Sequence, residues 1–445
     1  MRVGRPTLAA RNPQAGTEPL TTGPLAPAPF ELSGMGPTPS MSRNQVDPTT
    51  YHHLLLICCV VVFGCYFGTY MRLPVVPLYA RILGAGAVQV GIINAAFLFM
   101  AGALSLPLGI FSDRLGIKFL ISLGLLILSA TSFLLCLTTS PGEIVWLYLL
   151  SGVGLAAFGP TSMAFVANFS PPTHLGRSYG WYTMALYCGM SLGPAVGGFA
   201  AQDLGFPAVF LISGISILLT FWIVLFLLPR ARHVLVSRPA RSETVAVQVR
   251  LIAWNRPLLG CWLGTLGGCF ALGMFITFLP LHAHNQGLSY GQIGLVFMTQ
   301  GIMNAVSRIP FGHLSDRVVR RGNLVVLGLV GLTASIGGFG FASRPYHFIL
   351  GAVALGTSMG LAFTSIGALT AEAAPPELRG LAMGGYNSSI YLGMMLSSAL
   401  MGPVINRIGF KEGFVITALI NFLVIGFFYF FLKDFSSHPS EAALK

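Results

Sequence analysis

The chain has 445 residues, of which 54% are hydrophobic and only 9% are charged. A soluble domain carries about a quarter of its residues as Asp, Glu, Lys or Arg, so this composition excludes a soluble globular protein and indicates lipid as the surrounding medium. The formal net charge of +12 does not indicate nucleic-acid binding, because the basic residues lie in short links between apolar runs.

The two ends of the chain have the composition of tails. Residues 1–50 are rich in Pro, Gly, Thr and Ala and have no apolar periodicity, so we expect a disordered N-terminal tail. This tail lacks the charged and apolar regions of a signal peptide, and Met41 is a second candidate for the start of the protein. Residues 434–445 are expected to form a short C-terminal tail.

From His53 onward, apolar runs of membrane-spanning length alternate with short polar links. Lipid cannot satisfy backbone N–H and C=O groups, and the runs are too long and continuous for barrel strands, so we expect helices. The predicted fold class is therefore all-α, a polytopic membrane protein with twelve transmembrane helices. The predicted spans are 54–80, 88–111, 119–139, 144–168, 179–201, 206–228, 257–280, 290–311, 323–341, 347–370, 380–403 and 412–433.

The first span contains an arginine. Arg72 is followed by Pro74 and Pro77, which are expected to break the helix. Arg72 lies 18 residues past Leu54, ~27 Å along a helix, which places it near the far interface. A substrate contact and a snorkelling side chain are equally good interpretations of Arg72.

Basic residues predict the orientation of the spans. They are concentrated in the even-numbered links and are sparser in the odd-numbered links, so we expect the even links and both termini in the cytoplasm of a cell with the chain in its plasma (inner) membrane. The even links contain Arg114, Lys118, Arg230, Arg232, Arg238, Arg241, Arg250, Arg256, Arg317, Arg320 and Arg321, and the odd links contain Arg81, Arg344, Arg407 and Lys411. The longest link, 230–256, is the expected linker between six-helix halves at 51–229 and 257–433.

An internal repeat supports these two halves. A shift of 203 residues places the segment from Pro77 to Arg114 on the segment from Pro280 to Arg317, with matched glycines and charges. A shift of 204 residues aligns the fifth span with the eleventh and places Tyr187 on Tyr391. Two six-helix units in the same orientation form a parallel repeat.

The link after span 2 and its repeat after span 8 carry the same charged motif. The first copy contains Gly109, Asp113, Arg114, Gly116 and Lys118, and the second contains Gly312, Asp316, Arg317 and Arg321, with Val319 in place of the second glycine. We expect Gly109 to allow close helix contact and the charges to form a latch at the cytoplasmic surface. Both copies resemble the loop between spans 2 and 3 of the major facilitator superfamily. The resemblance covers residues 53–433 and implies transport by alternating access.

Span 5 contains small residues at helical spacing. Gly189, Gly193, Pro194, Gly197 and Gly198 form a flat face for close packing, and Pro194 is expected to bend the helix. This segment is similar to the antiporter motif of drug/proton exporters in the superfamily, and an ordinary glycine-rich interface is the alternative. The second half has Ser397 and Ser398 where Gly193 and Pro194 would repeat.

Span 8 has one polar face. Gln300, Asn304 and Arg308 recur every four residues, and an ionisable side chain in a span indicates a functional site. We expect these three residues, with Arg72, Tyr187 and Tyr391, to contact substrate, with Arg308 binding an anionic group. An arginine before a proline in span 8 also resembles monocarboxylate carriers. The alternative for Arg308 is a structural contact near the cytoplasmic face.

Proton coupling stays open because the mid-span sequences contain no Asp or Glu, and proton relays usually need one. Tyr148 stands where the drug/proton exporters often have an arginine, and Asn168 where they often have an acidic residue. We expect a secondary transporter, foremost an exporter of small organic compounds. The alternatives are an organic-anion or monocarboxylate carrier and a transporter-like ligand sensor. We expect a monomer with lipid and a small-molecule substrate as partners, protons as a candidate coupling ion, and no nucleic acid, metal, cofactor or enzymatic activity.

Overall fold

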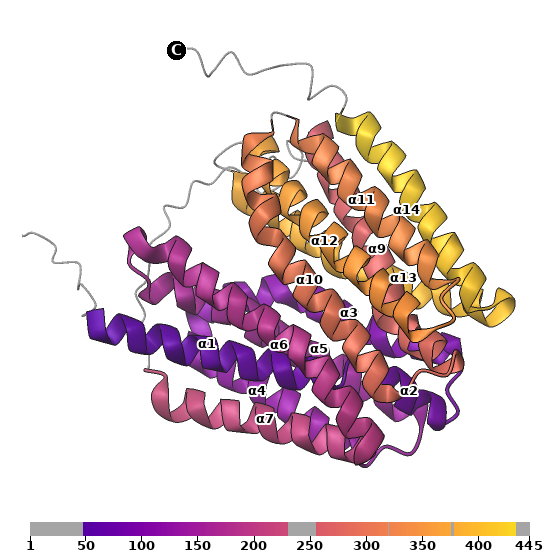
Figure 1. Ribbon diagram of the computed structural model, residues 1–445. Coiled ribbons are helices and arrows are strands. Elements are labelled where there is room, and N and C mark those ends of the chain that lie inside the picture. Colours follow the sequence, from indigo (N-terminus) through magenta and orange to yellow (C-terminus); the bar gives the residue numbers. More distant parts are fainter. Residues whose placement is uncertain (1–47, 230–254, 319, 375–377, 433–445) are drawn as a thin grey trace, which may run out of the picture. The chain divides into compact units, whose positions relative to one another are not determined.

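The computed structural model describes residues 48–229, 255–318, 320–374 and 378–432 (Figure 1). The expected N-terminal tail up to residue 47, the linker from 230 to 254 and the C-terminal tail lie outside these residues. The described chain consists of helices and short links, and it contains no strand.

Two consecutive helices together form the first span, and a single helix forms each of the other eleven. The first-half helices are α1 (Pro48–Met71), α2 (Val75–Ile82), α3 (Ala87–Leu115), α4 (Ile117–Leu135), α5 (Pro141–Phe169), α6 (Leu175–Asp203) and α7 (Phe206–Leu227), with a 3-10 turn η1 (Pro172–His174) before α6. The second-half helices are α9 (Arg256–Asn285), α10 (Tyr290–Arg317), α11 (Arg321–Phe339), α12 (Pro345–Ala373), α13 (Arg379–Ile408) and α14 (Phe410–Leu432).

The break between α1 and α2 confirms the prediction made from the prolines. Proline has no backbone N–H and clashes with the preceding helical turn, so α1 ends at Met71 and α2 begins after Pro74. Pro77, by contrast, lies within α2. The break leaves Arg72 at the junction of the two helices.

Eleven spans of the described chain are long and apolar enough to cross a membrane. The twelfth, α10, is 28 residues long, which is ample for a bilayer. Polar side chains, including Gln300, Asn304 and Arg308, interrupt its apolar sequence. The least apolar span is thus the one in which the sequence predicts a functional face.

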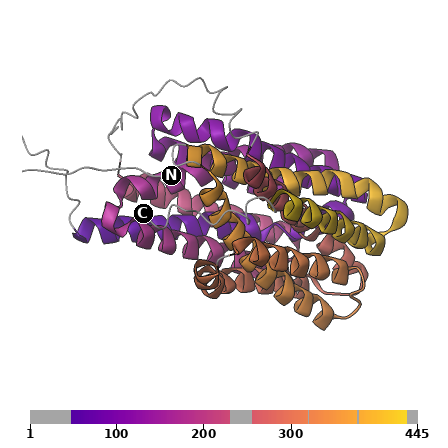
Figure 2. The same cartoon turned by 90° about the horizontal axis from the view of Figure 1, so that it is seen from above.

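The sequence repeat is also a repeat in packing (Figures 1 and 2). In the first half α1 packs on α6 and α3 on α5, and in the second half α9 packs on α13 and α10 on α12. The two halves meet through α6 with α10 and through α3 with α13, which are equivalent contacts under the repeat. This arrangement confirms two parallel six-helix halves.

The links between the helices lie at two opposite ends of the bundle. We call the end with the links 83–86, 136–140, 204–205, 286–289, 340–344 and 409 the outer end, and the opposite end the inner end. These names follow the orientation expected from the sequence.

Candidate functional site

The polar face of α10 lies against both halves of the molecule. Arg308 is partly buried, and its guanidinium carbon lies 4.7 Å from the centroid of the Tyr187 ring of α6. Its Nε donates to Oδ1 of Asn304 at 3.3 Å, and Gln300 Nε2 lies 3.1 Å from the Met359 sulfur of α12. Four of the six predicted substrate residues therefore lie on this face of α10 or against it: Gln300, Asn304, Arg308 and Tyr187. The Arg308 cation faces the Tyr187 ring across the interface between the halves.

Further tyrosines surround this pair. Tyr66 and Tyr70 lie one turn apart on α1, with ring centroids 6.0 Å apart, and both are in electrostatic contact with Tyr391 of α13. Tyr70 and Tyr386 are also in electrostatic contact with Tyr187. Tyr391, the repeat partner of Tyr187 and a predicted substrate residue, belongs to this cluster.

The described carboxylates lie away from the middle of the spans. Each occupies the first or last three residues of its helix: Asp113, Glu143, Asp203, Asp316, Glu372 and Glu412. Arg308 lies nine residues before the inner end of α10, ~14 Å along the helix. The described carboxylates are therefore all at helix ends, whereas Arg308 lies well inside its span.

Arg72 is in a different environment from Arg308. It is only 2% exposed, and neither terminal nitrogen of its guanidinium has a hydrogen-bond partner. Its electrostatic neighbours are Tyr148 of α5 and Cys65 of α1, which both belong to the first half. The structure therefore removes the snorkelling interpretation. It places Arg72 inside the first half rather than beside Arg308.

The glycine motif of α6 confirms the predicted close packing. A Cβ at Gly189 would lie 2.8 Å from the carbonyl oxygen of Phe63, and one at Gly193 would lie 2.6 Å from that of Phe67. A Cβ at Gly197 would overlap the carbonyl oxygen of Met71. These three glycines therefore set the contact of α6 with α1.

Gly198 and Pro194 of the same motif contact the other half of the molecule. A Cβ at Gly198 would overlap the carbonyl oxygen of Tyr290 in α10, and Pro194 lies against Gly294 of α10. One motif therefore joins α6 to its neighbour within the first half and to its partner across the interface.

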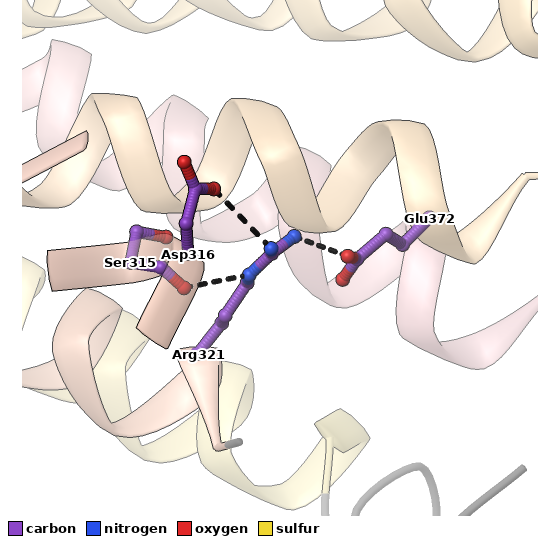
Figure 3. A network of polar contacts seen from close by, with 4 residues as sticks. All are labelled: Ser315, Asp316, Arg321 and Glu372. Atoms are coloured by element: carbon purple, nitrogen blue, oxygen red, sulfur yellow. Dashed lines mark hydrogen bonds and ion pairs between the residues drawn. The ribbon is translucent and has the colours of Figure 1, made fainter. Parts of the chain in front are cut away.

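The second copy of the charged motif forms a set of polar contacts at the inner end, all within the second half (Figure 3). Arg321 Nε donates to the carbonyl oxygen of Ser315 at 2.9 Å, and one terminal nitrogen lies 3.4 Å from Asp316. The other terminal nitrogen pairs with Glu372 at the end of α12. Arg317, also predicted to gate, is exposed at the last residue of α10.

The first copy is built differently. Gly116 precedes α4 with a φ of 90°, which favours glycine, and Lys118 donates to the carbonyl oxygens of Leu225 and Leu228 at the end of α7. Asp113 and Arg114 lie in the last turn of α3, and their side chains are outside the described structure.

The packing prediction for Gly109 is wrong. Gly109 was expected to permit close helix contact, and Gly312 is its equivalent in the repeat. A Cβ at Gly109 would lie 3.6 Å from Pro160, and one at Gly312 would lie 3.9 Å from Thr364, which are ordinary contacts. The helices are too far apart at these two positions for glycine to be required.

The sequence did not reveal Tyr66 and Tyr70, because an aromatic residue in an apolar span is indistinguishable from a packing residue. Glu372 was identifiable only as the repeat equivalent of Asn168. No group of three or more His, Cys, Asp or Glu residues in the described chain is arranged to hold a metal ion.

Two parallel six-helix repeats around an interface with a polar and aromatic site define a membrane transporter of the alternating-access type. The family model of the Major Facilitator Superfamily matches residues 58–291 and 261–445. The chain belongs to this superfamily.

Relatives and solved structures agree with this assignment. The chain is 22% identical to an uncharacterized MFS-type transporter of Methanocaldococcus jannaschii, over 82% of this chain and 94% of the relative. It is 27% identical to the human MFS-type transporter SLC18B1, over 80% and 81% of the two chains. It is 25% identical to the quinolone resistance protein NorA of Staphylococcus aureus, over 56% and 64%.

Two solved transporters share the fold. The nucleoside transporter NupG has a TM-score of 0.72 at 14% identity, over 85% of this chain and 99% of the other. A bacterial homologue of the human lysosomal transporter Spinster, in an inward-facing conformation, has a TM-score of 0.73 at 14% identity, over 88% and 99%. The relatives and structural neighbours are transporters, not enzymes.

Proposed function

We propose that this protein exports small organic anions by alternating access, and that Arg308 recognises the anionic group. The observation that carries the proposal is the contact of Arg308 with Tyr187 across the interface between the halves. In alternating access the interface is where a substrate is bound and released. A planar guanidinium there suits a carboxylate, sulfonate or phosphate.

The surroundings of Arg308 support an anion over a cation. The described carboxylates lie at helix ends, so an organic cation would meet an uncompensated positive charge. Tyr66, Tyr70, Tyr187 and Tyr391 offer aromatic faces, which favour an anion with an aromatic or apolar body. Gln300 and Asn304 lie on the same face of α10 as Arg308 and supply hydrogen-bonding groups beside it.

Export is supported by the likeness to NorA, whose name describes resistance to quinolones. Resistance to a compound is gained when the compound is removed from the cell. We further propose that the protein lies in the plasma membrane as a monomer with both termini in the cytoplasm, as the basic inner links suggest.

Transport in proteoliposomes tests this function. The full chain would be reconstituted and loaded with a radiolabelled naphthalene sulfonate, which stays charged at every working pH, or with tetraphenylphosphonium, each with and without a pH gradient. We expect protein-dependent flux of the sulfonate and none of the cation. Arg308→Ala should reduce sulfonate flux at least about tenfold, since a charge-assisted hydrogen bond contributes roughly 1.5–3 kcal/mol. Arg407→Ala, at the exposed outer end of α13, serves as the control.

The outcomes separate the alternatives. Flux of the cation against its gradient, or sulfonate flux that is unchanged in Arg308→Ala, contradicts the anion site. A pH gradient that drives sulfonate flux establishes proton coupling. Saturable binding of the sulfonate without flux identifies a ligand sensor instead.

A further inference from the structure

A cavity lies between α1 and α6 near the inner end, and Arg308 is not among its lining residues. Its volume is about 530 Å³, and its lining comes only from these two helices. Most of the lining is apolar, including Leu56, Phe63, Trp181 and Met184, and the polar exceptions are His52 and Arg177.

The glycine row of α6 explains why the two helices separate there. Positions 197, 193 and 189 lie four residues apart and carry glycines that hold α6 against the backbone of α1. The next two positions of the same row are Ala185 and Trp181, and both line the cavity. The close contact between α1 and α6 therefore ends where the glycines end. The larger side chains that follow in the row hold the helices apart and form the groove.

Large apolar side chains with high exposure border this groove. Leu56 is 64% exposed, Trp181 is 48% exposed and Met184 is 58% exposed. Side chains of this kind in a membrane protein contact hydrocarbon. The volume and the apolar lining suit an acyl chain.

The inner end of the groove is basic. Arg177 and His52 line it, and His174 lies in the turn that precedes α6. The described residues of α1, η1 and α6 contain no carboxylate other than Asp203, which is at the opposite end of α6. A hydrogen bond of 2.8 Å between Tyr51 and Ser178 ties the two helices beside these side chains. The Tyr51 ring contacts both His52 and His174.

We propose that this groove is a binding site for one anionic phospholipid of the inner leaflet. The acyl chain lies along Leu56, Trp181 and Met184, and the headgroup phosphate meets Arg177 at the membrane surface. An apolar slot with the Arg177 cation at its surface end matches the two parts of such a lipid. The site is made by α1 and α6 alone, and none of its lining residues is among the substrate residues proposed above.

Quenching of tryptophan fluorescence by lipid tests the proposal, because Trp181 is in the groove. The full chain would be placed in phosphatidylcholine nanodiscs containing increasing amounts of chain-brominated phosphatidylglycerol or chain-brominated phosphatidylcholine. The signal of Trp181 is the difference between wild type and Trp181→Phe. We expect half-maximal quenching at an about fivefold lower mole fraction of phosphatidylglycerol, the preference that one basic residue near the surface provides.

Substitutions of arginine distinguish a built site from general surface charge. Arg177→Gln should remove the preference, whereas Arg379→Gln, an exposed cation at the inner end of α13, should leave it intact. Trp222 lies on the exposed side of α7 and serves as the control tryptophan. Its signal, the fluorescence difference between wild type and Trp222→Phe, should show no preference for either lipid. Size-exclusion chromatography checks that each variant is folded, and native mass spectrometry should retain one phosphatidylglycerol in wild type and none in Arg177→Gln.

Several results would overturn this proposal. Equal quenching by the two lipids shows no headgroup recognition, and no quenching by either shows that something else covers the groove. An equal loss of preference in Arg379→Gln shows a general charge effect. Displacement of the lipid by the aromatic sulfonate, at the concentrations that saturate transport, makes the groove part of the substrate path instead.

Discussion

The carbonyl oxygen of Pro194 in α6 lies so close to Gly294 in α10 that a Cβ at position 294 would overlap it. The repeat produces the same contact between the carbonyl oxygen of Ser398 in α13 and Gly91 in α3. Residues 91 and 294 are equivalent under the repeat, as are 194 and 398. The two halves are therefore joined toward the outer end by a pair of equivalent glycine contacts.

We predict that Gly294→Ala or Gly91→Ala opens the outer side of the protein. The added methyl group meets a backbone oxygen that cannot rotate away, so the closed contact is destabilised by roughly 1–3 kcal/mol. The population of outward-open molecules should rise about five- to 100-fold, and transport should fall. Spin–spin distances between labels at the outer ends of α6 and α10 measure the opening.

Gly338→Ala is the matched control for these two variants. Gly338 is in a helix, and a Cβ there would meet nothing within 4 Å. This change should leave the distances and transport unaltered and should stabilise the helix slightly. Unchanged distances in Gly294→Ala would mean that the contact is not part of the gate.

The inner-end ion pairs predict an asymmetry between the halves. Arg321 pairs with Glu372 and Asp316 in the second half, whereas position 168, the equivalent of 372, is an exposed asparagine. Because the Arg321 side chain is 21% exposed and that of Glu372 is 47% exposed, the pair contributes at most about 1 kcal/mol. Glu372→Gln should change the inner-end opening rate about two- to fivefold at low salt and less at 1 M salt.

The converse change is Asn168→Glu, which supplies the first half with the missing carboxylate. We expect it to slow inner-end opening in a salt-dependent way, with Asn168→Gln as the uncharged control. Stopped-flow fluorescence of a probe at the inner end of α12 or α5 measures both rates. Equal effects of Asn168→Glu and Asn168→Gln would contradict a charge latch.

The span count, the break before Pro74 and the parallel repeat follow from the sequence, since lipid forces each long apolar run into a helix. Which face of each helix meets its neighbour does not follow. In water an apolar stripe marks the buried face, but in a membrane both the buried and the lipid-facing sides are apolar. Gly197 and Gly198 are adjacent in sequence, yet one faces α1 and the other faces α10.

Polar residues are the exception, because their cost in lipid directs them inward. For this reason the sequence predicted the Gln300, Asn304 and Arg308 face of α10, and it could not single out Tyr66 and Tyr70. The helix rise placed Arg72 near the far interface of the membrane. Its burial depends on Tyr148 and the other helices around it, which no local pattern describes.

Arg72 provides a prediction that separates stability from transport. Its guanidinium is buried and its terminal nitrogens are unpaired, an arrangement that costs folding free energy. Arg72→Met should therefore keep or raise the unfolding temperature. We expect transport to fall at least about tenfold, because an arginine inside the first half is expected to meet the anion once the outer side opens.

Arg72→Lys tests the need for a planar donor, and Arg81→Met, an exposed cation of α2, is the control that should change neither property. Thermal unfolding in detergent and sulfonate flux are measured on the same preparations. A drop in unfolding temperature of several degrees in Arg72→Met, with transport preserved in the surviving protein, would assign Arg72 to the structure of the first half.

Tyr187 is predicted to act through its ring rather than its hydroxyl. The ring lies under the Arg308 guanidinium at 4.7 Å, a contact that contributes roughly 0.5–2 kcal/mol. Tyr187→Phe keeps the ring, so the KM for the aromatic sulfonate should stay within about twofold of wild type. Tyr187→Leu removes the ring and should raise that KM about two- to 30-fold, because Arg308 is no longer held in place. Tyr346→Leu, at the exposed outer end of α12, controls for the loss of any tyrosine. If Phe and Leu at position 187 weaken transport equally, the hydroxyl binds the substrate and the ring contact is incidental.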